Sequence, residues 1–246
     1  MVVHADNGGP IYYSGCCGGN NYPLKGGKMS NWEGGIRVNA FVSGGFLPPH
    51  VRGTKQTGLM AGWDWFATYA GLARVDPTDH KANAAGLPAI DSHDLWPLLI
   101  GLTTVSPRTE LAIGAPNAVG GLINASYKLL LGTNAQAGWT GPRFPNTSSS
   151  WDPNLSKETC GPSPQTGCLF DLLADPTEHV NLAAAKPGVF RAMMRRLNEI
   201  NDTLFAPDRG SSDPAACVAA LGKYGDFWGP WIDVSTLQSA STSQET

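Results

Sequence analysis

The chain has 246 residues, enough for one large domain or for a domain with a smaller satellite. Hydrophobic residues make up 41% of it, so a sizeable core can be buried and wholesale disorder is excluded. The formal charge of −3 and the lack of Lys/Arg runs give no reason to expect nucleic acid. No apolar run approaches the length of a membrane span, and the 30 glycines and 19 prolines favour a loop-rich α/β protein.

The N-terminal part predicts two strands separated by a long irregular segment. A strand is expected over 1–5, with Val2 and Val3 buried, and another over 36–43, which is bounded by Gly-Gly and Pro-Pro pairs. The stretch between them, 6–35, is rich in glycine and has neither helical nor strand periodicity. Because such long loops are unusual inside a compact domain, we expect this one to be functional.

Two helices are expected next. In the segment 60–73, Trp63 and Phe66 belong to an apolar face with helical spacing, which predicts an amphipathic helix. A shorter helix is expected within 92–100, with Pro97 in its first turn.

The C-terminal part predicts short strands, one long helix and a disordered tail over 234–246. Apolar residues at three- and four-residue steps indicate the long helix, and Pro187 stands near its start. The other expected elements are a strand over 111–114, a hairpin over 121–132 that turns at 124–126, a loop over 133–165, a strand over 169–173 and this helix over 187–205.

Asp6 and Asn7 follow the first strand directly, in the sequence Asp-Asn-Gly-Gly. In open α/β sheets ligands bind beyond the carboxyl ends of strands, and a carboxylate beside an amide oxygen offers hard donors for Ca²⁺ or Mg²⁺. Taken alone, an ordinary Asn-Gly turn explains the same residues.

Lys25 and Lys28 enclose two glycines, an arrangement that brings an ammonium group close to an anion. A phosphate-binding P-loop is excluded, because Met29 follows the lysine where Ser or Thr is required and Tyr22 occupies the position of the first glycine. A solvated basic turn is the alternative that this motif leaves open.

The ordered set of motifs resembles one family. Asp-Asn-Gly-Gly, then Gly-Gly-Asn-Asn-Tyr-Pro-Leu-Lys-Gly-Gly-Lys, then Asn-Trp-Glu-Gly-Gly-Ile-Arg-Val follow one another within the first forty residues. This set resembles the type I sulfatases, and within them the arylsulfatase B group. The resemblance continues through the 60–73 helix, Ser-Tyr-Lys-Leu-Leu-Leu-Gly, Leu-Phe-Asp-Leu-Leu-Ala-Asp-Pro-Thr-Glu-His-Val-Asn-Leu and the terminal Trp-Gly-Pro-Trp-Ile.

The resemblance implies the C-terminal part of an α/β, alkaline-phosphatase-like (sulfatase) fold. Residues 1–110 would supply the last strands and a flanking helix of the large sheet. Residues 111–233 would form a smaller subdomain, an antiparallel sheet packed against the long helix, before the tail over 234–246.

The resemblance also implies roles for individual residues. Asp6 and Asn7 would be two oxygen ligands of Ca²⁺, and Lys28 would contact the sulfate group at the scissile bond as a catalytic and substrate-binding residue. Lys25 would add a positive field at longer range without being catalytic. Glu33 and Arg37 would form an ion pair that holds the loop.

The family's nucleophile is a formylglycine made from the cysteine of a Cys-x-Pro/Ala-x-Arg motif, which lies upstream of Asp-Asn-Gly-Gly. The sequence around Cys160 imitates this motif but has Pro164 where the arginine is required. Two ligands are also too few for Ca²⁺, which takes about six to eight oxygens. We therefore expect a sulfuric ester hydrolase present as a C-terminal fragment, inactive without the N-terminal half of the same enzyme as its partner.

The cysteines and glycosylation sequons indicate the secretory route. Cys160 and Cys168 flank a short loop and are expected to form a disulfide, which requires an oxidising compartment. Near-terminal cysteines of the family allow Cys217 to pair with the N-terminal half, while the pairing of Cys16 and Cys17 stays open. Sequons stand at Asn124, Asn146, Asn154 and Asn201. A secreted, lysosomal or other secretory-pathway glycoprotein is expected, although the N-terminus has no signal-peptide pattern.

Two alternatives accompany the hydrolase. A non-catalytic, degenerate sulfatase-like protein or binding module would explain the lack of a nucleophile in this chain. The retention of Asp6, Asn7 and Lys28 speaks against it, because a decayed site need not keep them. A phosphate-ester hydrolase of the same fold is the more distant alternative.

Overall fold

The structure is a computed structural model that describes residues 1–11, 19–115, 118–141, 156–204 and 212–232. The chain divides into two compact units, Met1–Leu204 and Phe205–Thr246. In the part that the structure describes, no helix is both long enough and apolar enough to cross a membrane. The domain boundary expected near residue 110 stays a prediction, and the tail over 234–246 lies outside the described residues.

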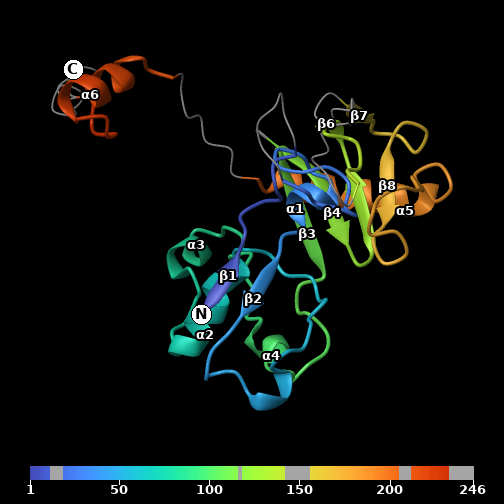
Figure 1. Ribbon diagram of the computed structural model, residues 1–246, viewed down its shortest axis with the longest axis horizontal. Helices are drawn as coiled ribbons and strands as arrows, with labels where there is room; N and C mark the ends of the chain where they lie inside the picture. Colours follow the sequence, from blue (N-terminus) through green and yellow to red (C-terminus); the bar gives the residue numbers. More distant parts are fainter. Residues whose placement is uncertain (12–18, 116–117, 142–155, 205–211, 233–246) are drawn as a thin grey trace. The chain divides into compact units, whose positions relative to one another are not determined.

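A four-stranded antiparallel sheet organises the C-terminal half of the larger unit (Figure 1). Alternate residues of its strands point to one face, where Leu122, Leu129 and Leu169 are opposite one another and completely buried. The strands lie in the order β3 (Glu110–Ala115), β4 (Ala118–Asn124), β5 (Tyr127–Leu130) and β8 (Cys168–Asp171). This is the smaller antiparallel sheet that the sequence predicts.

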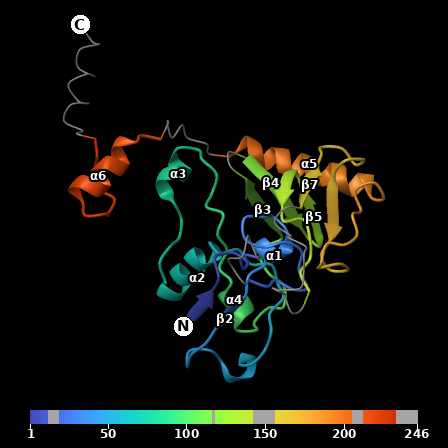
Figure 2. The ribbon, with the colours of Figure 1, turned by 45° about the horizontal axis from the view of Figure 1, so that its top comes forward.

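Helix α5 (Pro187–Asp202) covers that face of the sheet, as Figure 2 shows. It begins at Pro187, whose missing N–H is no loss in the first turn of a helix. Phe190 and Leu197 are completely buried against the leucines of the sheet. The expected packing of this helix on an antiparallel sheet is confirmed, and the helix ends three residues before the predicted limit.

The opposite face of the sheet packs against the last part of the long Gly-rich segment. Trp32 is completely buried there, with its ring edge-on to Phe170 at 5.8 Å between ring centroids. Its indole N–H donates to the carbonyl of Ala135 at 3.0 Å. Helix α1 (Glu33–Ile36), a single turn that the sequence analysis did not predict, begins directly after it. The Gly-rich segment is therefore fixed on the sheet.

A second small sheet lies within the segment predicted to be a loop. It consists of β6 (Gly132–Ala135) and β7 (Lys157–Cys160), which pair antiparallel. The loop prediction was wrong at both ends because polar residues, such as Thr133 opposite Thr159, form these strands and their side chains bond across the pair at 3.0 Å.

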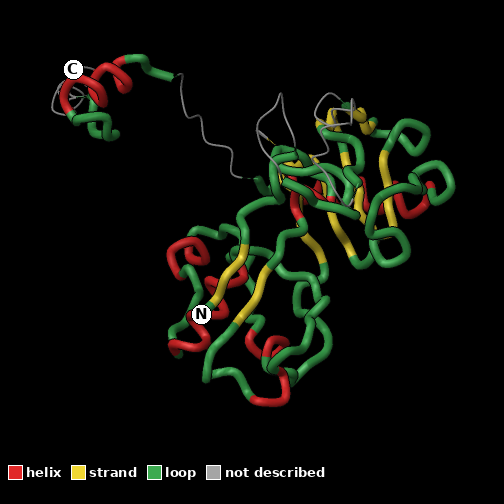
Figure 3. The backbone as a smooth tube through the Cα atoms, viewed as in Figure 1, coloured by secondary structure: helices red, strands yellow, loops and turns green. Residues whose placement is uncertain are grey.

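The N-terminal part of the larger unit has few strands and several short helices (Figure 3). Strand β1 (Val2–His4) pairs antiparallel with β2 (Ala40–Val42) in a sheet of two strands. The prediction that Val3 is buried was wrong: the side chain is exposed and Val2 is half-buried, because only one strand flanks β1. The helices are η1 (Pro49–Val51), α2 (Asp64–Ala73), α3 (His80–Ala84) and α4 (Trp96–Leu99), the last with Pro97 in its first turn as predicted.

A buried ion pair connects α2 to the start of β3. Arg108 donates to both carboxylate oxygens of Asp64, at 2.8 and 2.6 Å, and both side chains are almost completely buried. Burial opposes ionisation of Asp64, but the hydrogen bonds from Arg108 and from the N–H groups of Ala61 and His93 outweigh it, and the pKa of Asp64 is lowered. The stabilisation is therefore complete above the unfolded pKa and is lost as the pH falls through the folded pKa.

The described part of the smaller unit contains α6 (Ala215–Lys223), which the sequence analysis did not predict. The Tyr224 hydroxyl donates to the carbonyl of Pro230 at 2.8 Å, and the Trp231 indole donates to Asp213 at 2.9 Å. Cys217 carries a free, exposed thiol on this helix.

Replacing Arg108 by methionine should lower the free energy of unfolding by about 3–5 kcal/mol, because the buried carboxylate of Asp64 loses its cation. Urea unfolding at neutral pH and low micromolar concentration, followed by tryptophan fluorescence, measures the change. Glu199→Ala is the matched control, since it removes an exposed ion pair of Arg196 worth less than about 1 kcal/mol. Equal losses in both variants would contradict the assignment of Asp64–Arg108 as the main fastening of α2.

Candidate functional site

The loop after β1 lies directly against the lysine-containing segment. Gly9 accepts two hydrogen bonds at its carbonyl, from the Lys28 N–H at 3.2 Å and from the Asn21 side-chain amide at 2.9 Å. The Asn21 side-chain oxygen accepts the N–H of Gly9 at 2.8 Å. The N–H of Gly8 donates to the carbonyl of Gly35 at 2.8 Å. These bonds bring the three sequence motifs together into one unit.

Glycine is required where these backbones touch. A Cβ on Gly8 would lie 1.7 Å from the carbonyl oxygen of Gly34, and a Cβ on Gly34 would lie 2.3 Å from the carbonyl oxygen of Gly26. Neither neighbour is a flexible side chain, so any larger residue would push the motifs apart. The repeated Gly-Gly pairs therefore serve close packing of main chain on main chain.

The three residues predicted to bind metal and sulfate have free side chains. Asp6 and Lys28 are exposed and Asn7 is half-buried. Within the described ranges, none of these side chains forms a hydrogen bond or an ion pair, whereas the neighbouring Asn21 and Ser30 side chains are both bonded. Lys28 is tied through its own N–H to a residue two positions after Asn7. A carboxylate, an amide and an ammonium are thus available to a ligand, and their joint binding of one ligand stays a prediction.

Lys25 is buried rather than turned to solvent. Its ammonium pairs with Glu158 of β7 at 2.6 Å and lies 3.6 Å above the centre of the Trp32 ring. Trp139 adds a second aromatic ring at 4.8 Å. This environment gives Lys25 a structural role in attaching the loop to the small β6–β7 sheet.

Glu33 has a closer ion-pair partner than Arg37, the one that the sequence suggested. Arg37 lies 3.8 Å from one carboxylate oxygen of Glu33, while the ammonium of Lys128 lies 2.9 Å from the other. Lys128 also lies 2.8 Å from Glu178, and Glu178 accepts the main-chain N–H of Glu33 at 2.7 Å. Lys128 and Glu178 belong to motifs that carry the family resemblance, but neither received a role from sequence, because only the fold brings them to Glu33.

The electrostatics of this cluster are unusual. The side chains of Glu33, Lys128 and Glu178 are no more than 4% exposed. Burial raises the pKa of Glu178, and the nearby charge of Lys128 opposes this effect only in part.

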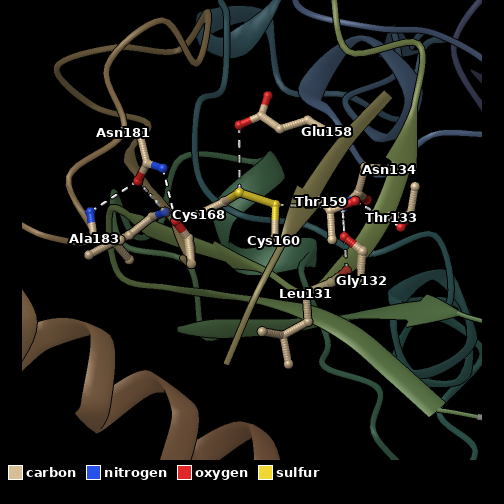
Figure 4. The surroundings of a disulfide bond; sticks show 12 residues. Leu131, Gly132, Thr133, Asn134, Glu158, Thr159, Cys160, Cys168, Asn181 and Ala183 are labelled. Carbon is tan, nitrogen blue, oxygen red and sulfur yellow. Dashed lines mark hydrogen bonds between the residues drawn. A yellow bond between two sulfur atoms is a disulfide. The ribbon is translucent and has the colours of Figure 1, made fainter. Parts of the chain in front are cut away.

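A group of Glu158, Cys160 and Cys168 has the spacing of metal ligands, but its chemistry is already used (Figure 4). The two cysteines form a disulfide, as the sequence suggested, with an S–S distance of 2.03 Å. Glu158 pairs with Lys25. This group therefore does not fit a metal centre, unlike the hard oxygens of Asp6 and Asn7.

The remaining predicted positions are scattered. Asn124 is half-buried, and its side-chain amide donates to Glu110 at 3.2 Å, while Asn201 is half-buried at the end of α5. Asn146 and Asn154 lie outside the described residues. Glycosylation at these sequons stays a prediction, as do the pairings of cysteines 16 and 17, which also lie outside the described residues.

A cavity of about 430 Å³ opens beside β3 and α5. Its lining includes Arg108 and Arg196, but both guanidinium groups are already paired, with Asp64 and Glu110 respectively. None of the predicted site residues lines it. The Asp6–Lys28 loop, rather than this cavity, is the candidate functional site.

Several sulfatases are similar to this chain over most of its length. Arylsulfatase J of Mus musculus is 29% identical over 94% of this chain and 39% of that protein. Steryl-sulfatase of Mus musculus is 33% identical over 88% of this chain and 32% of that protein, and arylsulfatase A of Homo sapiens is 29% identical over 78% and 36%. The chain therefore spans about a third of the length of these relatives. No family model matches it.

Solved structures show the same fold. A sulfatase from Pseudoalteromonas sp. is similar with a TM-score of 0.57 and 20% identity, over 82% of this chain and 36% of that one. The crystal structure of Ps i-CgsB has a TM-score of 0.58 and 18% identity, over 93% of this chain and 43% of that one. At these identities the likeness shows the fold, which is the alkaline-phosphatase-like α/β fold of the sulfatases. The chain belongs to the sulfatase family and represents its C-terminal portion.

Proposed function

We propose that the chain supplies the C-terminal part of a calcium-dependent, arylsulfatase-type sulfuric ester hydrolase. The observation that supports this best is the hydrogen bond from the Lys28 N–H to the Gly9 carbonyl at 3.2 Å. It connects the segment of the ammonium to the strand end that carries Asp6 and Asn7. A cation site beside an anion-binding lysine is the arrangement that a sulfate ester requires.

The chemistry of the donors fits the proposed metal. The carboxylate of Asp6 and the side-chain oxygen of Asn7 are hard ligands that suit Ca²⁺, which would stabilise negative charge on the sulfate oxygens when bound. Lys28 would bind the sulfate group and stabilise the charge that grows on its oxygens as the ester bond breaks. Because Ca²⁺ takes about six to eight oxygen ligands, further ligands would come from outside this pair.

The missing ligands and the formylglycine nucleophile would come from the N-terminal portion of the sulfatase fold. The proposed partner portion would also cover an apolar surface, which consists of Val3 and Phe41 on the β1–β2 sheet and of Phe66 and Tyr69 on α2. All four side chains are exposed, and a two-stranded sheet has little stability without neighbours. The relatives are about three times as long as this chain, and the proposed partner portion would correspond to part of their additional length.

By itself, the chain would therefore be inactive. The disulfide between Cys160 and Cys168 supports a secreted, lysosomal or other secretory-pathway location, since such bonds persist in oxidising compartments.

The activity is tested on the form in which this chain follows its upstream sequence in frame, using an aryl sulfate ester as substrate. Lys28→Ala should lower kcat by about 10²–10³-fold, because a charge-stabilising donor is removed from the transition state. Asp6→Ala should raise the Ca²⁺ concentration needed for half-maximal activity. Lys81→Ala, which changes an exposed lysine away from the loop, is the control and should leave both values unchanged.

Two results would contradict the proposal. One is an upstream sequence without a Cys-x-Pro/Ala-x-Arg motif, in which case a non-catalytic sulfatase-like protein becomes the better description. The other is full hydrolytic activity in the Lys28→Ala variant.

The apolar surface predicts different behaviour for the chain alone and for the joined form. Phe66→Ser should reduce self-association and the binding of a hydrophobic dye by the isolated chain, because it removes exposed apolar area. In the joined form the same change should lower the free energy of unfolding by about 3–5 kcal/mol, as expected for truncation of a buried phenylalanine. Light scattering, dye fluorescence and urea unfolding measure these effects.

Phe227→Ser, at another exposed phenylalanine, is the control for the joined form and should have little effect there. A joined form in which Phe66→Ser costs no more than this control would show that the surface remains uncovered.

A further inference from the structure

Lys128 is completely buried, and its ammonium lies between two carboxylates. It is 2.9 Å from Oε1 of Glu33 and 2.8 Å from Oε1 of Glu178. With all three groups ionised, this cluster has a net charge of −1 at a place that solvent barely reaches. An unbalanced buried charge is unfavourable, so the cluster is held most tightly when it gains one positive charge or loses one negative charge.

Neighbouring charges do not remove this excess. Arg37 lies 3.8 Å from Oε2 of Glu33, but its side chain is half-exposed and its attraction is screened. In the described part of the chain, the Lys25 ammonium is already paired with Glu158 at 2.6 Å, and Asp171 at the end of β8 is itself a carboxylate. His179 lies 3.9 Å from Asp175 and carries a charge only when it is protonated. Since no further cation of the described residues balances the cluster, a proton is the means of neutralising it that we consider.

We propose that Lys128, Glu33 and Glu178 form a positioning cluster for Asp6, Asn7 and Lys28, and that it holds their loop most firmly when one of its carboxyl groups carries a proton. The proposed function supplies the consequence for catalysis, but the effect on the loop exists without it. A sulfatase with this cluster would align its metal ligands and its sulfate-binding lysine best in a mildly acidic compartment.

The cluster reaches the loop through a short series of contacts. Glu178 accepts the N–H of Glu33 at 2.7 Å and so fixes the first residue of α1. Two residues later, the carbonyl of Gly35 accepts the N–H of Gly8 at 2.8 Å. A Cβ on Gly8 would lie 1.7 Å from the carbonyl oxygen of Gly34, so the main chains of the two segments are in direct contact here. A shift of α1 must therefore move the strand end that carries Asp6 and Asn7.

The titration of Glu178 agrees with this geometry. Burial raises its pKa above the ordinary value of 4.5. At a pH between the ordinary pKa of 4.5 and the raised pKa, the folded chain binds more protons than the unfolded chain. The free energy of unfolding therefore declines as the pH rises through the folded pKa. The pKa of Asp64 is lowered, so this group changes the stability only below about pH 4, outside the pH range in which Glu178 does.

Urea unfolding of the full chain between pH 5 and pH 8 tests the proton. In the parent chain the unfolding equilibrium constant should rise severalfold over this range, because the folded chain gives up its extra proton as the pH rises. Glu178→Gln removes one of the two negative charges and should flatten the dependence. Glu158→Gln is the matched control, because Glu158 fastens the same loop through a balanced pair with Lys25. It should weaken the fold but keep the parent's pH dependence.

Hydrogen exchange of single amides tests the positioning. The N–H groups of Gly8 and Gly34 each donate to a main-chain carbonyl of the loop, and the N–H of Leu131 donates to Gly120 in the sheet as a reference. In Lys128→Met, protection of Gly8 and Gly34 at pH 7 should fall at least about tenfold more than protection of Leu131, with partial recovery at pH 5. Equal loss at all three amides, or an unchanged pH dependence in Glu178→Gln, would overturn the proposal.

Neither measurement uses a metal or a sulfate ester. Failure of the hydrolase assay would leave the two results standing, and failure of the two results would leave the hydrolase assay standing. In the joined form, Glu178→Gln should also flatten the acid preference of kcat/KM at saturating Ca²⁺, and an unshifted pH profile would contradict the role of the cluster in positioning.

Discussion

The burial of Trp32 on the second face of the β3–β4–β5–β8 sheet is the contact on which the candidate site depends. A glycine-rich segment has few apolar side chains to order it, so it needs a fixed point. Trp32 supplies that point with its completely buried ring and its hydrogen bond to the carbonyl of Ala135. Lys25, stacked on this ring and paired with Glu158, adds a second attachment to the same surface.

Charge is used in two ways around this fixed point. Lys25 pairs with one carboxylate, that of Glu158, and Arg108 pairs with the buried Asp64 while its second partner, Asp91, is exposed to water. These pairs therefore fasten segments at nearly any physiological pH. The cluster of Lys128 opposes one cation to two carboxylates and is therefore sensitive to protons. Replacing a buried ion cluster by apolar residues of similar volume is often neutral or stabilising, so stability alone does not account for these buried charges.

Sequence reasoning located the candidate loop but not the framework that holds it. Local patterns sufficed for α5, whose Pro187 start and apolar spacing depend on nearby residues, and the ordered motifs sufficed for the family. They failed for β6 and β7, since polar strands such as Lys157–Cys160 have no period that separates them from a loop. Lys128 and Glu178 were missed for a different reason: Glu33 lies 95 residues before Lys128, and no spacing in the sequence reveals that they meet.

The two ends of the site differ in what supports them. Lys28 belongs to a segment that is fixed on the β3–β4–β5–β8 sheet, and this sheet has its own apolar core under α5. The described residues therefore suffice to hold the main chain of Lys28 in place. Asp6 and Asn7 follow β1, which has one strand neighbour and exposed apolar side chains. The Gly8–Gly35 hydrogen bond is thus the point where a self-sufficient half-structure meets one that needs further packing. A protein portion that covers β1 and α2 would act on the proposed metal ligands Asp6 and Asn7 first, and on Lys28 only through this contact. In the function proposed above, assembly of the fold would thus be coupled directly to completion of the cation site.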